Sequence, residues 1–61
     1  MNQDEMMIII LKDELNLNVV KIDKLYYVYS NDKRLLFITS NVKNVVKGLL
    51  VLYKEDYKNE I

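Results

Sequence analysis

Residues 18–39, NVVKIDKLYYVYSNDKRLLFIT, decide the fold. They contain three short runs that are rich in β-branched, aromatic and other large apolar residues, as strands are. The breaks between the runs, Asp23-Lys24 and Asn31-Asp32-Lys33, consist of residues that tolerate tight turns. The pattern therefore predicts a three-stranded antiparallel meander. Along the middle run, 25–30, odd-numbered residues face one side of the sheet and even-numbered residues face the other. Neither set is cleanly polar, so we expect both faces to be covered.

A helix is predicted before the meander, from about residue 3 to residue 15. Asn2 can cap its first turn, with Glu5 three residues later in capping-box register. Asn16 suits the left-handed position that ends many helices, and Leu17 supplies the apolar contact that accompanies such an ending. The apolar run 6–11, MMIIIL, is also consistent with a buried strand, because short apolar runs do not distinguish the two. We favour the helix.

A second helix is predicted after the meander, from about residue 40 to residue 57, with Ser40 as its N-cap. Its apolar residues fall at helical spacing and form one stripe: Val42, Val45, Val46, Leu49, Leu52 and Tyr53. Gly48 lies inside this helix at a cost of about 1 kcal/mol relative to alanine. Either a neighbouring segment approaches the helix closely there, or the position is exposed and the cost is tolerated. The polar residues after about 57 are expected to fray.

The whole chain, residues 1–61, is therefore expected to be one small α+β domain with the order helix, three-stranded antiparallel meander, helix. A domain of about 60 residues buries only about 60% of the surface of its unfolded chain, so its stability is marginal. Small domains usually add disulfides, a metal or a partner subunit, and this chain has neither Cys nor His. A partner subunit remains, and we predict a homodimer.

Both predicted helices carry more apolar residues than one face can bury. Exposed apolar patches of this kind mark interaction sites, and a closed two-fold dimer is the commonest way to cover them. Tyrosine is also enriched in interfaces, because its ring is apolar and its tip is polar. The predicted dimer or partner interface comprises Met6, Ile9, Ile10, Tyr26, Leu50, Val51 and Tyr57.

The composition argues against most catalytic chemistry. Nucleophilic catalysis of the Ser–His or Cys–His type needs a histidine, and the chain has none. The single glycine lies in a predicted helix, so no glycine-rich loop is available to wrap a phosphate. Six of the nine acidic residues form three pairs of sequence neighbours on the predicted helices, where adjacent side chains diverge by about 100°. We therefore predict a protein that is not an enzyme and that holds no cofactor and no metal.

The sequence offers no segment for crossing a membrane. The longest apolar run, 6–11, has six residues, whereas a spanning helix needs about 20. Asp4 and Glu5 stand where a secretory signal carries positive charge. We expect a cytoplasmic protein with no membrane partner. Abundant Ile, Asn, Lys and Tyr, with one Gly and no Pro, are typical of an AT-rich bacterial or phage genome.

The leading functional hypothesis is a small protein that binds a larger protein and acts as an inhibitor or an adaptor. A compact domain without catalytic groups can still form a specific interface through aromatic anchors and a charged rim. Small phage proteins that block a host defence or a host enzyme, in the host cytoplasm, are of this general kind.

The alternative is a nucleic-acid-binding regulator with a basic face formed across a dimer. Its candidate contacts are Lys33, Arg34, Lys43 and Lys47. Nine basic and nine acidic residues cancel, so no overall excess of positive charge favours nucleic acid. The predicted order of elements is similar to that of double-stranded-RNA-binding domains, but the likeness is confined to topology. That family opens its second helix with a cluster of lysines, whereas residues 40–44 contain one.

Overall fold

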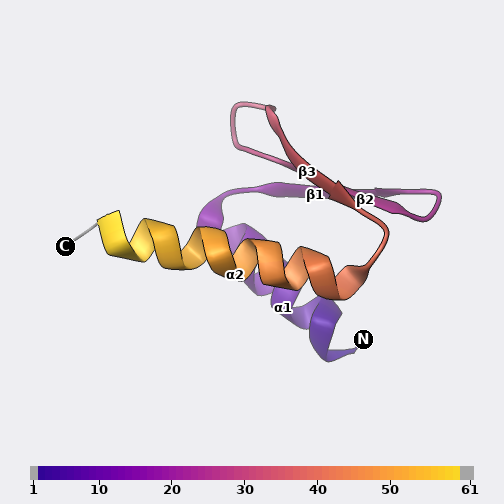
Figure 1. Ribbon diagram of the computed structural model, residues 1–61, viewed down its shortest axis with the longest axis horizontal. Coiled ribbons are helices and arrows are strands. Elements are labelled where there is room, and N and C mark those ends of the chain that lie inside the picture. The colour runs from indigo at the N-terminus through magenta and orange to yellow at the C-terminus, as the bar shows by residue number, and fades with distance from the viewer. Residues whose placement is uncertain (1, 60–61) are drawn as a thin grey trace.

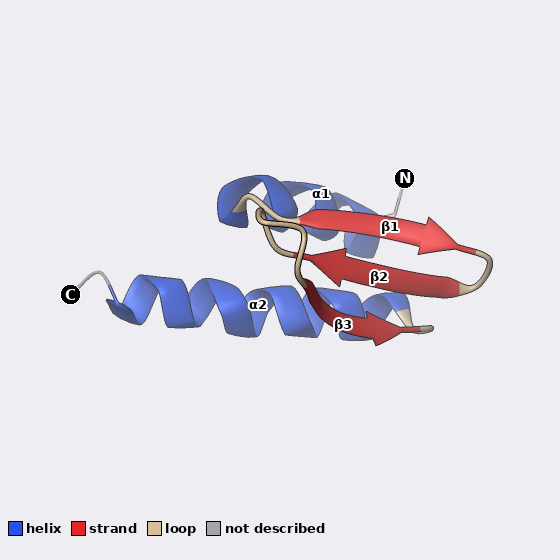
Figure 2. Ribbon diagram, turned by 90° about the horizontal axis from the view of Figure 1, so that it is seen from above, coloured by secondary structure: helices blue, strands red, loops and turns tan. Residues whose placement is uncertain are grey.

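The computed structural model describes residues 2–59 of the chain, and the side chains of residues 2–55. Its elements are α1 (Gln3–Leu15), β1 (Asn18–Ile22), β2 (Leu25–Tyr29), β3 (Leu35–Thr39) and α2 (Val42–Asn59). The three strands form one antiparallel sheet in sequence order, and both helices lie on the same side of it (Figures 1 and 2). The predicted α+β fold and its order of elements are confirmed.

Both ends of α1 are capped as the sequence predicts. The side chain of Asn2 accepts a hydrogen bond of 2.8 Å from the backbone N–H of Glu5. Asn16 has left-handed backbone angles (φ 57°, ψ 48°), and the N–H of Leu17 donates to the carbonyl of Lys12 at 2.8 Å. This is the six-to-one bond of a Schellman ending. The run 6–11 is therefore helix and not strand.

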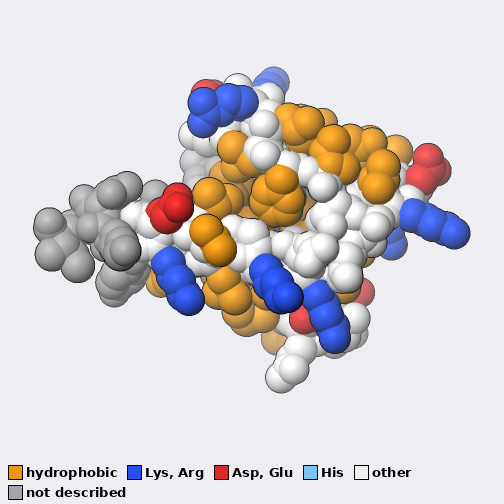
Figure 3. All heavy atoms as spheres, viewed as in Figure 1, with side chains coloured by type: hydrophobic (Ala, Val, Ile, Leu, Met, Phe, Trp, Pro, Cys, Tyr) orange, Lys and Arg blue, Asp and Glu red, His pale blue; other side chains and the backbone are white. Residues whose placement is uncertain are grey.

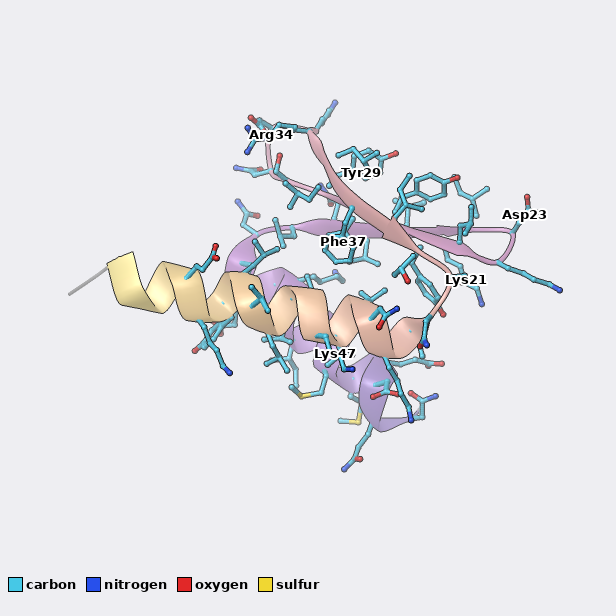
Figure 4. The ribbon with its side chains drawn as sticks, viewed as in Figure 1. Lys21, Asp23, Tyr29, Arg34, Phe37 and Lys47 are labelled. Carbon is cyan, nitrogen blue, oxygen red and sulfur yellow. The ribbon has the colours of Figure 1, made fainter. Side chains whose placement is uncertain are left out.

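The two turns of the meander lie at opposite ends of the sheet, as the positions of Asp23 and Arg34 show (Figure 4). The first turn has two residues, and Asp23 takes a positive φ of 56°. The second is closed by a hydrogen bond of 2.8 Å from the N–H of Ser30 to the carbonyl of Arg34, with Lys33 at φ 68°.

The N-cap of α2 is Asn41, so the prediction of Ser40 is wrong by one residue. The side chain of Asn41 accepts from the N–H of Lys43 at 2.9 Å, and its carbonyl accepts from the N–H of Val45 at 3.3 Å. The side chain of Thr39 accepts from the N–H of Asn41 at 3.2 Å and holds the cap in place. The helix continues to Asn59, beyond the expected end near residue 57.

The core lies between the helices and the sheet. Its buried residues come from α1, β2 and α2: Ile8, Leu11, Val28, Val45 and Leu49. Gly48 is explained by Phe37, which points from β3 toward α2 (Figure 4). A Cβ atom at Gly48 would lie 2.5 Å from Cζ of Phe37, which is closer than real contacts allow. Of the two readings of Gly48, close approach of a neighbouring segment is therefore the correct one.

Candidate functional site

The pairing register of the strands sorts their side chains onto two faces. Residues directly opposite each other in an antiparallel pair point to the same side. Val28 pairs with both Val19 and Phe37, and all three contact the core, so this is the inner face. The alternate residues form the outer sheet face: Asn18, Val20, Ile22, Leu25, Tyr27, Tyr29, Leu35 and Ile38.

Every residue of the outer sheet face except Asn18, at the start of β1, is apolar or aromatic, and the helices do not cover this face (Figure 2). Its five aliphatic side chains are 39% to 53% exposed, and its two tyrosines are half-buried. Figure 3 shows apolar side chains gathered over the strands along the upper side of the molecule. We expected both faces of the sheet to be covered. Within this chain, only the inner face is.

β3 contains a β-bulge, which changes the residues of this strand that lie on each face of the sheet. The register skips one residue between Val28 and Tyr29, whose partners are Phe37 and Leu35. A bulge places two residues opposite one and bends the strand. As a result the neighbours Leu36 and Phe37 both pack against the core, whereas Leu35 is 45% exposed on the outer face.

The residues of the predicted interface differ in exposure. Met6, Ile9, Ile10 and Val51, on the helices, are exposed. Leu50 of α2 and Tyr26 of β2 are half-buried and pack against the core of their own chain. Tyr57 lies beyond the side chains that the structure describes.

None of the residues of the outer sheet face is among the interface residues predicted from the sequence. The signal was nevertheless present, because Leu25, Tyr27 and Tyr29 alternate with Tyr26 and Val28 and leave neither side polar. The sequence did not indicate which side the helices would take. That choice depends on how the two short connections turn.

An open groove of about 230 Å³ lies between α1 and β1. Its apolar lining includes Ile9 of α1 and Val19 of β1, and charged side chains from both elements line it as well. The ammonium group of Lys21 lies 5.5 Å from the centre of the Tyr26 ring, at a distance typical of a cation–π contact. Lys21 therefore occupies an inward-pointing position on the edge strand β1.

The candidate nucleic-acid contacts do not form one patch within a single chain. Lys43 and Lys47 lie one turn apart at the start of α2, whereas Arg34 lies at the turn between β2 and β3 (Figure 4). Asp32 shares that turn. The pKa of Asp32 is held below its usual range, because the Ser30 hydroxyl donates a hydrogen bond to its carboxylate and the Arg34 charge adds to the effect.

Neither a metal cluster nor a membrane-spanning helix is found in the described part of the chain. Among residues 2–55, no three acidic side chains come close enough together to hold a metal ion. Within the same part of the chain, no helix is both long and apolar enough to cross a bilayer. Comparison with protein-family models, with curated proteins and with solved structures gives no match.

Proposed function

We propose that this chain is a small homodimeric protein-binding module that acts in the cytoplasm by occupying a surface of a larger protein, as an inhibitor or an adaptor. A phage protein directed against a host defence or a host enzyme fits this description. The apolar surface that the chain leaves uncovered is the single observation that carries the proposal, because the outer sheet face is largely apolar and α1 also exposes apolar residues.

The balance of buried and exposed apolar residues supports this proposal. The described part of the chain buries five hydrophobic residues, yet it exposes nine large ones, and five of those nine lie together on the outer sheet face. Scattered exposed apolar residues are normal, whereas contiguous patches of several hundred Å² mark interaction sites. The exposed apolar residues of α1 are Met6, Ile9 and Ile10, and they form a second, smaller surface, because Ile9 and Ile10 lie about one helical turn after Met6.

Capture from a lysate of the source organism tests this proposal. The tagged wild-type chain is compared with Ile38→Glu on the sheet, Ile10→Glu on α1, and Gln3→Glu. Gln3→Glu is the matched control, because it adds the same charge at an exposed position of α1 that carries no apolar side chain. We expect one protein to be captured by the wild type and by Gln3→Glu, and to be lost with at least one of the other two. Equal capture by all four chains, or by none, contradicts the proposal.

A nucleic-acid-binding regulator is the second candidate. Lys43 and Lys47 favour it, because they lie on one face of α2, whose first turn has no acidic residue. Lysines are also spaced along α2 on the side seen in Figure 3. An anisotropy titration with DNA and RNA at low and moderate salt tests it. Binding with a steep salt dependence that is lost in Lys43→Glu/Lys47→Glu supports this candidate. No binding at low salt contradicts it.

A further inference from the structure

We propose that the outer sheet face is the self-association surface of this protein, and that a second copy covers it face to face with its strands running in the reverse direction. The inference deepens the proposed function, since it assigns the sheet to the second copy and leaves the helix side of both copies for the larger partner. It also makes the dimer a sandwich of two three-stranded sheets.

The area of the outer sheet face matches what such a dimer needs. From their exposed fractions, its seven apolar and aromatic side chains together present on the order of 500 Å² of largely apolar surface, as much as the largest patch on a typical monomer. Two such faces bury about 1,000 Å² in total, which is the lower threshold for a specific interface. Sheets packed in this way keep their strands within about 30° of each other, with inner side chains interdigitated.

The free edges of the sheet favour this arrangement over a continuous six-stranded sheet. β1 and β3 are the edge strands. β1 carries the inward-pointing charge of Lys21, and β3 carries the bulge at Leu36. Inward charges and bulges are two features by which natural sheets prevent edge-to-edge pairing. The outer sheet face therefore remains the surface of the sheet that a second copy can cover.

Charge repulsion selects the direction of the strands. One end of the sheet carries Asp23 and Lys24, whose charges cancel, and the other carries Lys33 and Arg34 beside a single carboxylate, Asp32, which leaves that end net positive. A two-fold axis parallel to the strands would place the two net positive ends together. An axis perpendicular to the strands, within the plane between the sheets, instead brings the net positive end of each copy to the neutral end of the other.

The same axis fixes which side chains meet. Val20, Tyr27 and Ile38 form the central row across the three strands, since Tyr27 pairs with Val20 on one side and with Ile38 on the other. With reversed strands this row lies along the two-fold axis, so Ile38 meets Ile38 of the second copy. With parallel strands, Ile38 would meet Val20 of the second copy.

Sedimentation equilibrium on the purified full chain tests the surface without any other protein. We expect the wild type to have twice the 7.3 kDa of one chain at micromolar concentration, and Val51→Glu to behave in the same way, because Val51 lies on α2 away from the sheet. Ile38→Glu should weaken the dimer by at least about 100-fold, since each dimer then buries two unpaired charges. Circular dichroism confirms that all three chains are folded.

Two sets of variants test the strand direction. Asp23→Lys should weaken the dimer about fivefold at low salt, and adding Arg34→Glu should restore it, because the two ends that face each other then carry opposite charges. The chain has no native cysteine, so a short bifunctional maleimide should link Ile38→Cys to itself. In a parallel arrangement the double variant would give no rescue, and Ile38→Cys would link only to Val20→Cys.

A wild type that is monomeric at millimolar concentration overturns the proposal. So does a dimer that survives Ile38→Glu but dissociates with Val51→Glu or Ile10→Glu. These outcomes are independent of the capture experiment, because a monomer can still bind a larger protein. Failure of the wild-type chain to capture any protein, together with an intact dimer, would instead count against the proposed function alone.

Discussion

The inner and outer faces of the sheet consist of alternate residues from the same three strands, and both are largely apolar, yet only the inner face becomes a core. Val28 is fully buried there, whereas Ile38, next to its partner Phe37, is 47% exposed on the other side. The connections α1–β1 and β3–α2 have two residues each, so each helix must fold back along the strand that adjoins it. Both connections turn to the same side. Hydrophobicity alone therefore predicts that a face needs a cover, and the connections decide which face the chain itself can cover.

The largest effect is expected from placing the same charge on each face. Val28→Asp should leave the chain unfolded, because an unpaired charge in the core exceeds the stability of so small a domain. Ile38→Asp should leave the single chain folded, with a change in its unfolding free energy of about 0.5 kcal/mol or less. Circular dichroism with urea titration at low protein concentration measures both. Equal destabilisation by the two substitutions would show that the faces do not differ.

The bulge on β3 offers a sharper contrast between sequence neighbours. Leu36→Lys should destabilise the chain by about 2–3 kcal/mol, because Leu36 packs against the core. Leu35→Lys should cost little under the same dilute conditions, since Leu35 is already exposed. Urea unfolding of the two variants provides the measurement. A strand without the bulge would give the reverse order, with Leu35 and Phe37 on the inner side.

The contact between Gly48 and Phe37 tests how tightly the inner face is covered. Gly48→Ala should destabilise the chain by about 1–2 kcal/mol, although alanine is the better helix former by about 1 kcal/mol. The new Cβ would meet the Phe37 ring, which must shift. In the background of Phe37→Leu, the same substitution should be neutral or stabilising. If Gly48→Ala stabilises the wild-type chain, the inner face is more loosely packed than the structure indicates.

The smallest effect is expected at Asp32, in the turn between β2 and β3. The pKa of Asp32 is lowered in the folded chain, so its contribution to stability is present above its unfolded pKa, near 4, and is lost as the pH falls through the folded value. Asp32→Asn should therefore reduce stability slightly at pH 7, and the difference should disappear at acidic pH. NMR titration of Ser30→Ala should show the Asp32 pKa returning toward its usual range. An unchanged pKa would remove the Ser30 hydrogen bond as its cause.

Local sequence signals predicted most of the fold, because each is decided by a few neighbouring residues. The caps Asn2 and Asn16 mark α1, and the turn residues at 23–24 and 31–33 separate the strands. The alternation of side chains along residues 25–30 predicted which of them share a face, with Tyr26 on one side of the sheet and Tyr27 on the other. The features that the sequence did not predict depend on contacts between distant segments. Tyr26 and Leu50 are half-buried only because α1 and α2 pack together over the inner face, and the bulge at Leu36 appears only when β3 pairs with β2.

The measurement that tests the central claim most directly is the solvent exposure of methyl groups on the two sides of the molecule as a function of concentration. In NMR spectra with a soluble paramagnetic agent, we expect the Ile22 and Ile38 methyl signals of the outer sheet face to be protected in concentrated samples. They should become broadened on dilution. The methyl signals of Met6 and Val51, on the helices, should be broadened throughout. Outer-face methyl groups that stay fully accessible in the most concentrated sample would contradict the claim that a second copy covers this face.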